Sequence, residues 1–133
     1  MTSKVIYKGD LRTRCVHLKS DSMIETDAPT DNNGKGEAFS PTDLVATALA
    51  SCMITVMGIK AAANNIHFER VQAEVTKTMD SAPRRIAEIR VNFLVEEKWT
   101  ANEKKIMENT ARNCPVTHSL HANLKQTVTF TYK

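Results

Sequence analysis

The sequence has few aromatic residues and no cluster of charge of one sign. Phenylalanine, tryptophan and tyrosine make up 5% of its 133 residues, which is too few for a surface on which nucleic-acid bases stack. The net charge is only +3, and no run of five or more basic residues occurs. The electrostatic signature of a nucleic-acid-binding protein is therefore missing, and we expect no such partner.

The first part of the chain also has no long apolar stretch. Residues 1–14, MTSKVIYKGDLRTR, are polar and charged, so we expect no signal peptide and a cytoplasmic protein. The longest apolar segment is interrupted by Thr47, Ser51 and Thr55 and follows a helix-capping signal. We interpret it as a buried helix and expect no membrane association.

Cysteine is also scarce. Cys15, Cys52 and Cys114 are the only three, and an odd number without a secretion signal does not indicate a framework of structural disulfides. Thiol chemistry or simple burial fits better. The length and the 41% hydrophobic content predict one domain over residues 1–133 with a core of its own.

Turn-forming residues and hydrophobic periodicity predict an α+β fold. Strands are predicted where apolar and polar residues alternate, and where a short apolar run has turn-forming residues on both sides. The predicted strands are 4–8, 13–19, 23–27, 68–79, 86–96 and 124–132. Helices are predicted over 41–64, from the capping box at 100–103 to about 113, and as a short turn over 115–120. Residues 28–39 are predicted to form a loop.

The helix predicted over 41–64 has apolar residues around most of its circumference, which is typical of a helix buried on several sides. Its length would be about 36 Å, too long to bury within one small domain. We therefore predict an obligate dimer in which the partner subunit covers this helix.

Five side chains could carry chemistry, although each also has a structural interpretation. Cys52 and Cys114 suit a buried core, and a reactive thiol would need a nearby cation or hydrogen-bond donor. Arg12 and Arg14 lie on the same side of a predicted strand, which equally suits a solvated face. Asp43 suits a helix cap. Cys15 faces away from both arginines and receives no role.

A zinc site is a weaker alternative. Cys114, His118 and His121 follow helical spacing, and Cys52 would complete a set of four ligands of the types that zinc prefers. The chain has no paired CxxC motif, however, and three of the four ligands come from one short cluster.

Two motifs together resemble the OsmC/Ohr family of osmotically inducible and organic hydroperoxide resistance proteins. "SPTDLVATALASC" leads into the long predicted helix, and "NCPVTHSL" follows the second one. The resemblance covers essentially the whole chain. It implies an OsmC-like fold, with antiparallel sheets around a long buried central helix in an intertwined homodimer.

The resemblance also implies a thiol-dependent peroxidase without metal or other cofactor. Cys52 would be the peroxidatic nucleophile and Cys114 the resolving thiol. Arg12, or as second choice Arg14, would stabilise the thiolate. The substrate would be an organic hydroperoxide and the reductant a dithiol, which in several family members is a lipoylated protein. The apolar lining of the site would include Met53, Met57 and Phe39.

One position departs from the family pattern. The active peroxidases have a glutamate ten residues before the peroxidatic cysteine, and this chain has Thr42 there. Asp43 is the neighbouring acid, so either it pairs with the arginine or the pair is absent. This leaves an alternative function, a non-enzymatic protein that binds a small apolar ligand at the dimer interface.

Overall fold

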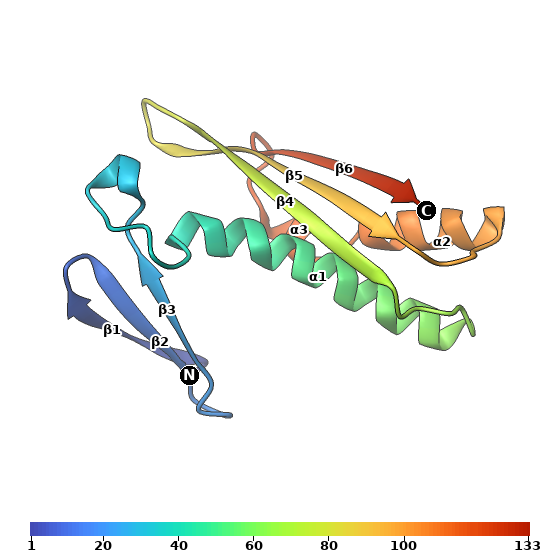
Figure 1. Ribbon diagram of the computed structural model, residues 1–133, viewed down its shortest axis with the longest axis horizontal. Helices are drawn as coiled ribbons and strands as arrows, with labels where there is room; N and C mark the ends of the chain where they lie inside the picture. The colour runs from blue at the N-terminus through green and yellow to red at the C-terminus, as the bar shows by residue number, and fades with distance from the viewer. The chain divides into compact units, whose positions relative to one another are not determined.

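The computed structural model describes residues 1–133 and divides the chain into two compact units, residues 1–45 and 46–133 (Figure 1). The single domain predicted over residues 1–133 stays a prediction. The α+β class is confirmed, because two three-stranded sheets and three α-helices alternate along the chain.

The first unit contains an antiparallel sheet of order β1–β2–β3. Its strands are β1 (Ser3–Gly9), β2 (Arg12–His17) and β3 (Met23–Asp27), and a 3₁₀ turn, η1 (Thr30–Asn32), follows. These bounds confirm the three predicted strands to within two residues at each end. The register opposes Val5 to Cys15 and Cys15 to Ile24, so these three side chains share one face of the sheet.

This first sheet has almost no core. Thr26, Asp27 and Ser40 are the only buried residues among the first 45, and all three are polar. Several large apolar side chains are exposed in the single chain, among them Val5, Ile6, Tyr7, Leu11, Met23, Ile24 and Phe39. A sheet with so little apolar burial is not expected to be stable alone.

The second unit contains a sheet of order β4–β5–β6, with strands β4 (Val71–Asp80), β5 (Arg85–Val95) and β6 (Lys125–Tyr132). β4 and β5 form the predicted antiparallel hairpin. β6 pairs with β5 in parallel, where the resemblance implied an antiparallel sheet. The reason is the connection between them, which passes through α2 (Ala101–Ala111) and α3 (Pro115–Ser119) and so forms a crossover.

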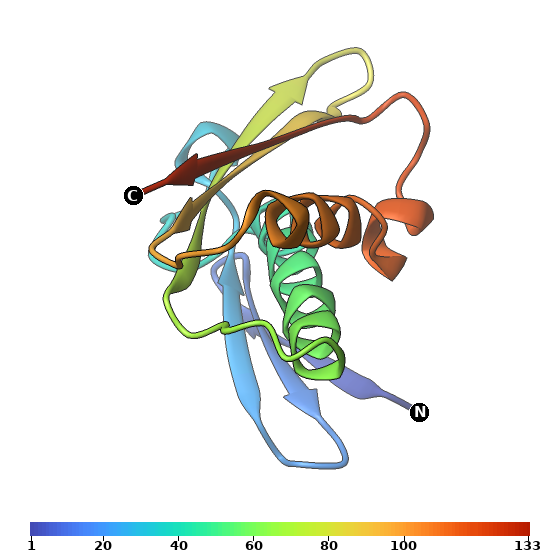
Figure 2. The ribbon, with the colours of Figure 1, turned by 90° about the vertical axis from the view of Figure 1, so that its right-hand side faces the viewer.

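The long helix α1 (Pro41–Ala63) begins at the capping signal expected from the sequence. Ser40 Oγ accepts from the Asp43 N–H at 3.0 Å, and Asp43 Oδ2 accepts from the Ser40 N–H at 3.0 Å. The second predicted capping box is also present, between Thr100 and Glu103. Within the second unit, α1 and α2 lie on the same face of the sheet (Figures 1 and 2).

The hydrophobic core fills the space between this sheet and the helices, and all of its buried apolar residues lie between 46 and 114. In the single chain α1 is buried along one face only, through Ala46, Leu49, Ala50, Met53, Met57 and Ala61. The opposite face presents Ala48, Ser51, Thr55, Ile59 and Ala62 as exposed residues. By length and hydropathy alone, α1 is also the one helix that would suffice to cross a membrane.

Candidate functional site

The two cysteines assigned by the resemblance lie next to each other, although 62 residues separate them in the sequence. Cys52 comes from the middle of α1, and Cys114 directly precedes α3. Their thiols are within hydrogen-bonding reach. Both are free thiols; Cys52 is half-buried and Cys114 is fully buried in the core. The second unit therefore places two thiols where one can react with the other.

The surroundings act differently on the two thiols. Burial raises the pKa of the Cys52 thiol, and its hydrogen bond to Cys114 raises it further, against the opposing effect of the Val116 N–H. Burial also acts to raise the pKa of Cys114, but hydrogen bonds from Thr117, Cys52 and Val116 outweigh it and lower that pKa. Within this unit the hydrogen bonds favour a thiolate at Cys114 and disfavour one at Cys52, so a cation from elsewhere would be needed to stabilise the Cys52 thiolate.

Thr117 holds Cys114 in place through two contacts. Its backbone N–H donates to Cys114 Sγ at 3.3 Å, and its hydroxyl lies 3.2 Å from the same sulfur. The Thr117 carbonyl accepts in turn from Gln126 on β6 at 3.2 Å. A cavity of about 300 Å³ lies beside this residue. It is lined by Met53, Arg112, Thr117, Leu124, Gln126 and Val128.

Of the predicted apolar lining, Met53 borders this cavity. Met57 is fully buried in the core, and Phe39, in the first unit, is about half exposed. A shared role for all three in one pocket stays a prediction.

Arg12, the first-choice arginine, lies in a network of carboxylates within the first unit. Its Nε and Nη2 donate to Asp27 Oδ1 and Oδ2 at 2.7 and 2.8 Å. Nη2 also lies 3.2 Å from Glu37 Oε2, and Nη1 lies 3.9 Å from Glu25 Oε2. The hydrogen bond to Arg12 lowers the pKa of Asp27, and the guanidinium is held in a fixed orientation.

Arg14 has a looser arrangement. Its Nη2 lies 3.3 Å from Glu25 Oε1 on the neighbouring strand, so both arginines share the charged face of this sheet. Cys15 lies on the other face, as predicted, with its sulfur 4.0 Å from the Thr13 hydroxyl. Arg12 has the more fully organised surroundings of the two, and its assignment to the site stays a prediction.

Asp43 caps α1 through the Ser40 N–H, which is the structural interpretation given to it above. Thr42, at the position of the family glutamate, lies with its hydroxyl 3.2 Å from Ser40 Oγ. The carboxylate that pairs bidentately with Arg12 is Asp27, and the sequence analysis did not find it. The pairing of Asp43 with an arginine stays a prediction.

The zinc alternative gains no support from the geometry. No three side chains of histidine, cysteine, aspartate or glutamate gather in an arrangement that could hold a metal ion. His121 Nδ1 instead accepts from the Asn123 N–H at 3.0 Å, and His118 is exposed on α3.

Sequence reasoning missed Thr117, Asp27 and Glu37. Two signals were available for the first two. Thr117 follows Cys114 by three residues, the spacing at which a capping residue receives a backbone N–H. Asp27 is opposite Arg12 once β2 and β3 are paired across the turn at 20–22. Glu37 lies in the 28–39 loop, whose path no periodic pattern specifies.

Comparisons with known proteins identify the family of the chain. The family model described as OsmC-like protein matches residues 34–129, and no curated protein matches the chain. An osmotic stress induced and detoxification response protein from Psychrobacter arcticus 273-4 is 50% identical, with 98% of this chain and 96% of that chain covered and a TM-score of 0.95.

Two more distant solved structures share the fold. OsmC from Legionella pneumophila, described as an organic hydroperoxide resistance protein, is 17% identical, with coverage of 98% and 97% and a TM-score of 0.73. An organic hydroperoxide resistance protein from Vibrio cholerae is 12% identical, with coverage of 98% and 91% and a TM-score of 0.76. Because the family model matches most of the chain and a solved structure is 50% identical over nearly its whole length, this chain belongs to the OsmC family.

Proposed function

We propose that this protein is a thiol-dependent peroxidase that reduces organic hydroperoxides through Cys52 and Cys114. The observation that carries the proposal is the adjacency of the two thiols, one half-buried on α1 and one fully buried before α3. Similarity to solved structures described as organic hydroperoxide resistance proteins supports the same chemistry.

In the first step the Cys52 thiolate attacks an oxygen of the hydroperoxide and the O–O bond breaks. The departing alkoxide takes up a proton and leaves as an alcohol, while Cys52 becomes a sulfenic acid. Cys52 is the sulfur with access to a substrate, because Cys114 has no exposed surface. In the second step Cys114 attacks the Cys52 sulfur, a disulfide forms and water leaves.

The first step requires a cation beside Cys52, because its surroundings in residues 46–133 raise the pKa of this thiol. We assign that role to Arg12. Its guanidinium is oriented by Asp27 and Glu37, and it is about one third exposed. An arginine held in this way loses little side-chain entropy when it also meets a thiolate or a peroxide oxygen.

A homodimer completes the proposal. The sheet of the first unit exposes Val5, Tyr7 and Ile24, and α1 has an exposed stripe of small residues with Ile59. Contiguous exposed apolar surface of this kind is typical of an interface. A second copy of the chain would cover both surfaces, and small side chains allow a second helix to approach closely.

The deciding experiment is the intact mass of the reduced protein before and after one equivalent of cumene hydroperoxide, followed by peptide mapping. We expect the loss of two hydrogens and a Cys52–Cys114 disulfide within one chain. Cys52→Ser should abolish this loss and the turnover of the peroxide. Unmodified thiols at this dose would contradict the proposal and favour a protein that only binds a small apolar ligand.

The proposed catalytic cycle closes with an external dithiol, which reduces the disulfide by exchange. A lipoylated protein is one such reductant. Turnover of cumene hydroperoxide with dihydrolipoamide or glutathione as the only reductant tests this choice, and we expect the dithiol to support turnover and the monothiol to support little.

A further inference from the structure

The two sulfurs of the proposed disulfide differ in access and in hydrogen bonding. Cys114 is fully buried, and two groups of Thr117 contact its sulfur: the backbone N–H donates to it at 3.3 Å, and the hydroxyl lies 3.2 Å away, where it can donate once the sulfur carries no proton. Cys52 is half-buried on α1. This asymmetry bears on how the disulfide is reduced, because exchange requires one sulfur to be attacked and the other to leave.

We infer that Thr117 makes Cys114 the leaving thiolate, so that the dithiol reductant attacks Cys52. This inference rests on the proposed function. The reductant's thiolate forms a bond to Cys52 Sγ, the Cys52–Cys114 bond breaks, and its electron pair goes to Cys114 Sγ. The second thiol of the reductant then attacks the reductant's own sulfur in the mixed disulfide. Cys52 leaves as a thiolate and the reductant becomes a cyclic disulfide.

Two features of the geometry favour this direction over the reverse. An attacking thiolate must approach a sulfur through open space, and the Cys114 side chain has no exposed surface. The sulfur that leaves develops negative charge, and hydrogen bonds from Thr117 stabilise that charge. A thiol with a lower pKa leaves faster. Thr117 is itself fixed by Gln126, which donates to its carbonyl, so its donors are in position before the bond breaks.

The test uses Thr117→Val, which removes the hydroxyl but keeps the size and the backbone N–H, and Thr117→Ser as its matched control. The disulfide is formed with diamide, so the experiment does not depend on peroxidase activity. Reduction by dithiothreitol is then followed by acid quench and mass analysis. We expect Thr117→Val to slow reduction about 3- to 10-fold and Thr117→Ser to stay within about twofold of the wild type.

Two further readouts separate this role from a merely structural one. Brief exposure of the oxidised protein to the monothiol 2-mercaptoethanol should leave the mixed disulfide on Cys52, as peptide mapping would show. In the Cys15→Ser/Cys52→Ser background, the ultraviolet absorbance of the thiolate against pH, which needs no reagent to reach the buried sulfur, should give a higher pKa for Cys114 in Thr117→Val than in Thr117→Ser. A mixed disulfide on Cys114, or equal reduction rates and pKa values in the two variants, would overturn the inference.

The inference and the proposed function can fail separately. A diamide-formed disulfide that is attacked at Cys52 with no peroxide turnover would leave the inference standing and contradict the peroxidase. Peroxide turnover together with attack of the reductant at Cys114 would support the peroxidase and contradict the inference. If diamide does not join Cys52 to Cys114, both are wrong.

Discussion

Arg12 and Asp27 are joined by two parallel hydrogen bonds, Nε to Oδ1 at 2.7 Å and Nη2 to Oδ2 at 2.8 Å. The carboxylate is almost completely buried, and its side chain is 2% exposed against 32% for the arginine. Oδ2 also accepts from the Glu37 N–H at 3.0 Å. Asp27 therefore holds both the Arg12 guanidinium and the backbone of Glu37 in the 28–39 loop.

The first prediction concerns the position of Arg12. Asp27→Asn keeps the shape of the side chain but removes its charge and one of the two strong acceptors, so the guanidinium loses its fixed orientation. We expect a tenfold or larger loss in kcat/KM for cumene hydroperoxide, about 1.4 kcal/mol of transition-state stabilisation. Arg12→Lys should reduce kcat/KM by a similar factor, since an ammonium cannot pair bidentately with Asp27. Arg14→Lys is the matched control, and a larger loss there would move the role to Arg14.

The second prediction concerns the 28–39 loop, where Gly34 makes a close approach to backbone. A Cβ at this position would collide with the carbonyl of Ala28, which cannot move as a side chain would. We expect Gly34→Ala to destabilise the protein by about 1–3 kcal/mol in urea unfolding. Lys35→Ala, at an exposed neighbour, should change the free energy of unfolding by less than about 0.5 kcal/mol. Equal stability of the two variants would show that the loop can shift at no cost.

Local signals in the sequence specify most of the fold. The capping boxes at 40–43 and 100–103 fix where α1 and α2 begin, and alternation over β4 and β5 fixes their hairpin. The parallel pairing of β6 was not predictable in this way. It depends on how α2 and α3 return the chain to the start of β5, and alternation is the same in parallel and antiparallel strands of a half-buried sheet.

In the candidate site, too, local sequence signals identified some residues, while others depend on how distant segments meet. Cys52 and Cys114 were identified by their motifs, and no spacing rule brings together residues 62 apart. Asp27 and Thr117 were missed because each acts through a neighbour, one across a strand pair and one across a single helical turn. Spacing and strand pairing could have placed both residues near Cys114 and Arg12, but aspartate and threonine are common at such places, so the geometry is needed to show the contacts that they make.

The third prediction concerns Cys114. Cys114→Ser keeps one oxidation of Cys52 but removes the thiol that would condense with the sulfenic acid. We expect one equivalent of cumene hydroperoxide to add one oxygen to Cys52, and excess peroxide to carry it to sulfinic acid. Mass analysis of the Cys52 peptide checks this result. Cys15→Ser is the control and should form the disulfide normally. Sustained turnover by Cys114→Ser would mean that another thiol resolves the sulfenic acid.

The fourth prediction concerns the exposed apolar surfaces. Ile24 and Ile59 are 49% and 66% exposed in the single chain, and we expect a partner subunit to bury both. Burying an isoleucine stabilises by about 1.5–3 kcal/mol, and each substitution occurs twice in a dimer. Ile24→Lys or Ile59→Lys should therefore weaken dimerisation at least about a hundredfold. Sedimentation velocity checks this, with Thr2→Lys as control. A wild-type monomer at micromolar concentration would contradict the dimer.

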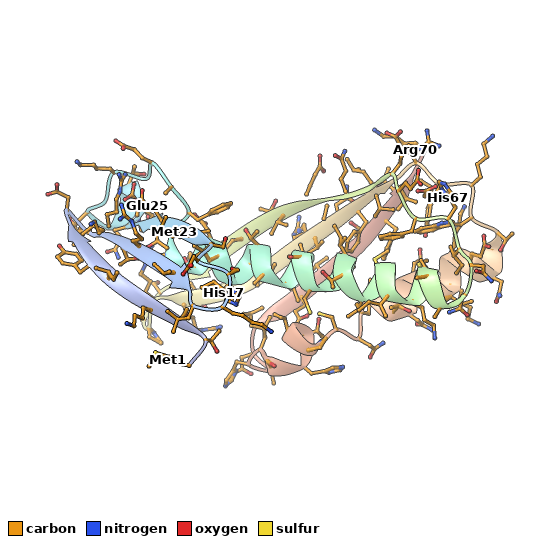
Figure 3. All side chains as sticks on the ribbon, turned by 90° about the horizontal axis from the view of Figure 1, so that it is seen from below. Met1, His17, Met23, Glu25, His67 and Arg70 are labelled. Carbon is orange, nitrogen blue, oxygen red and sulfur yellow. The ribbon has the colours of Figure 1, made fainter.

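The fifth prediction concerns Glu97, a buried carboxylate that joins two segments of the second unit, the connection between β5 and α2 and the connection between α1 and β4. Oε1 accepts from the N–H groups of Glu69 and Arg70 at 2.6 and 2.7 Å, and Oε2 lies 2.7 Å from His67 Nδ1. Figure 3 labels His67 and Arg70 in the connection between α1 and β4. Burial acts to raise the pKa of Glu97, but these hydrogen bonds outweigh it and lower the pKa to about 2.

The lowered pKa makes stability depend on pH in one direction. Because the carboxylate binds a proton more weakly in the folded state, its contribution is complete above the unfolded pKa of about 4.3. It is lost as the pH falls from there toward 2. We expect urea unfolding at pH 7, 5, 4 and 3 to show this loss in the wild type.

Glu97→Gln should flatten the acid dependence. Glu97→Ala should cost about 2–4 kcal/mol at pH 7, because it leaves two backbone N–H groups unpaired. Glu69→Gln is the matched control, since Glu69 Oε2 lies 3.6 Å from His67 Nε2 but its side chain is exposed. If Glu69→Gln flattened the profile as much as Glu97→Gln, the acid dependence would come from His67 and its surface charges and not from the buried carboxylate.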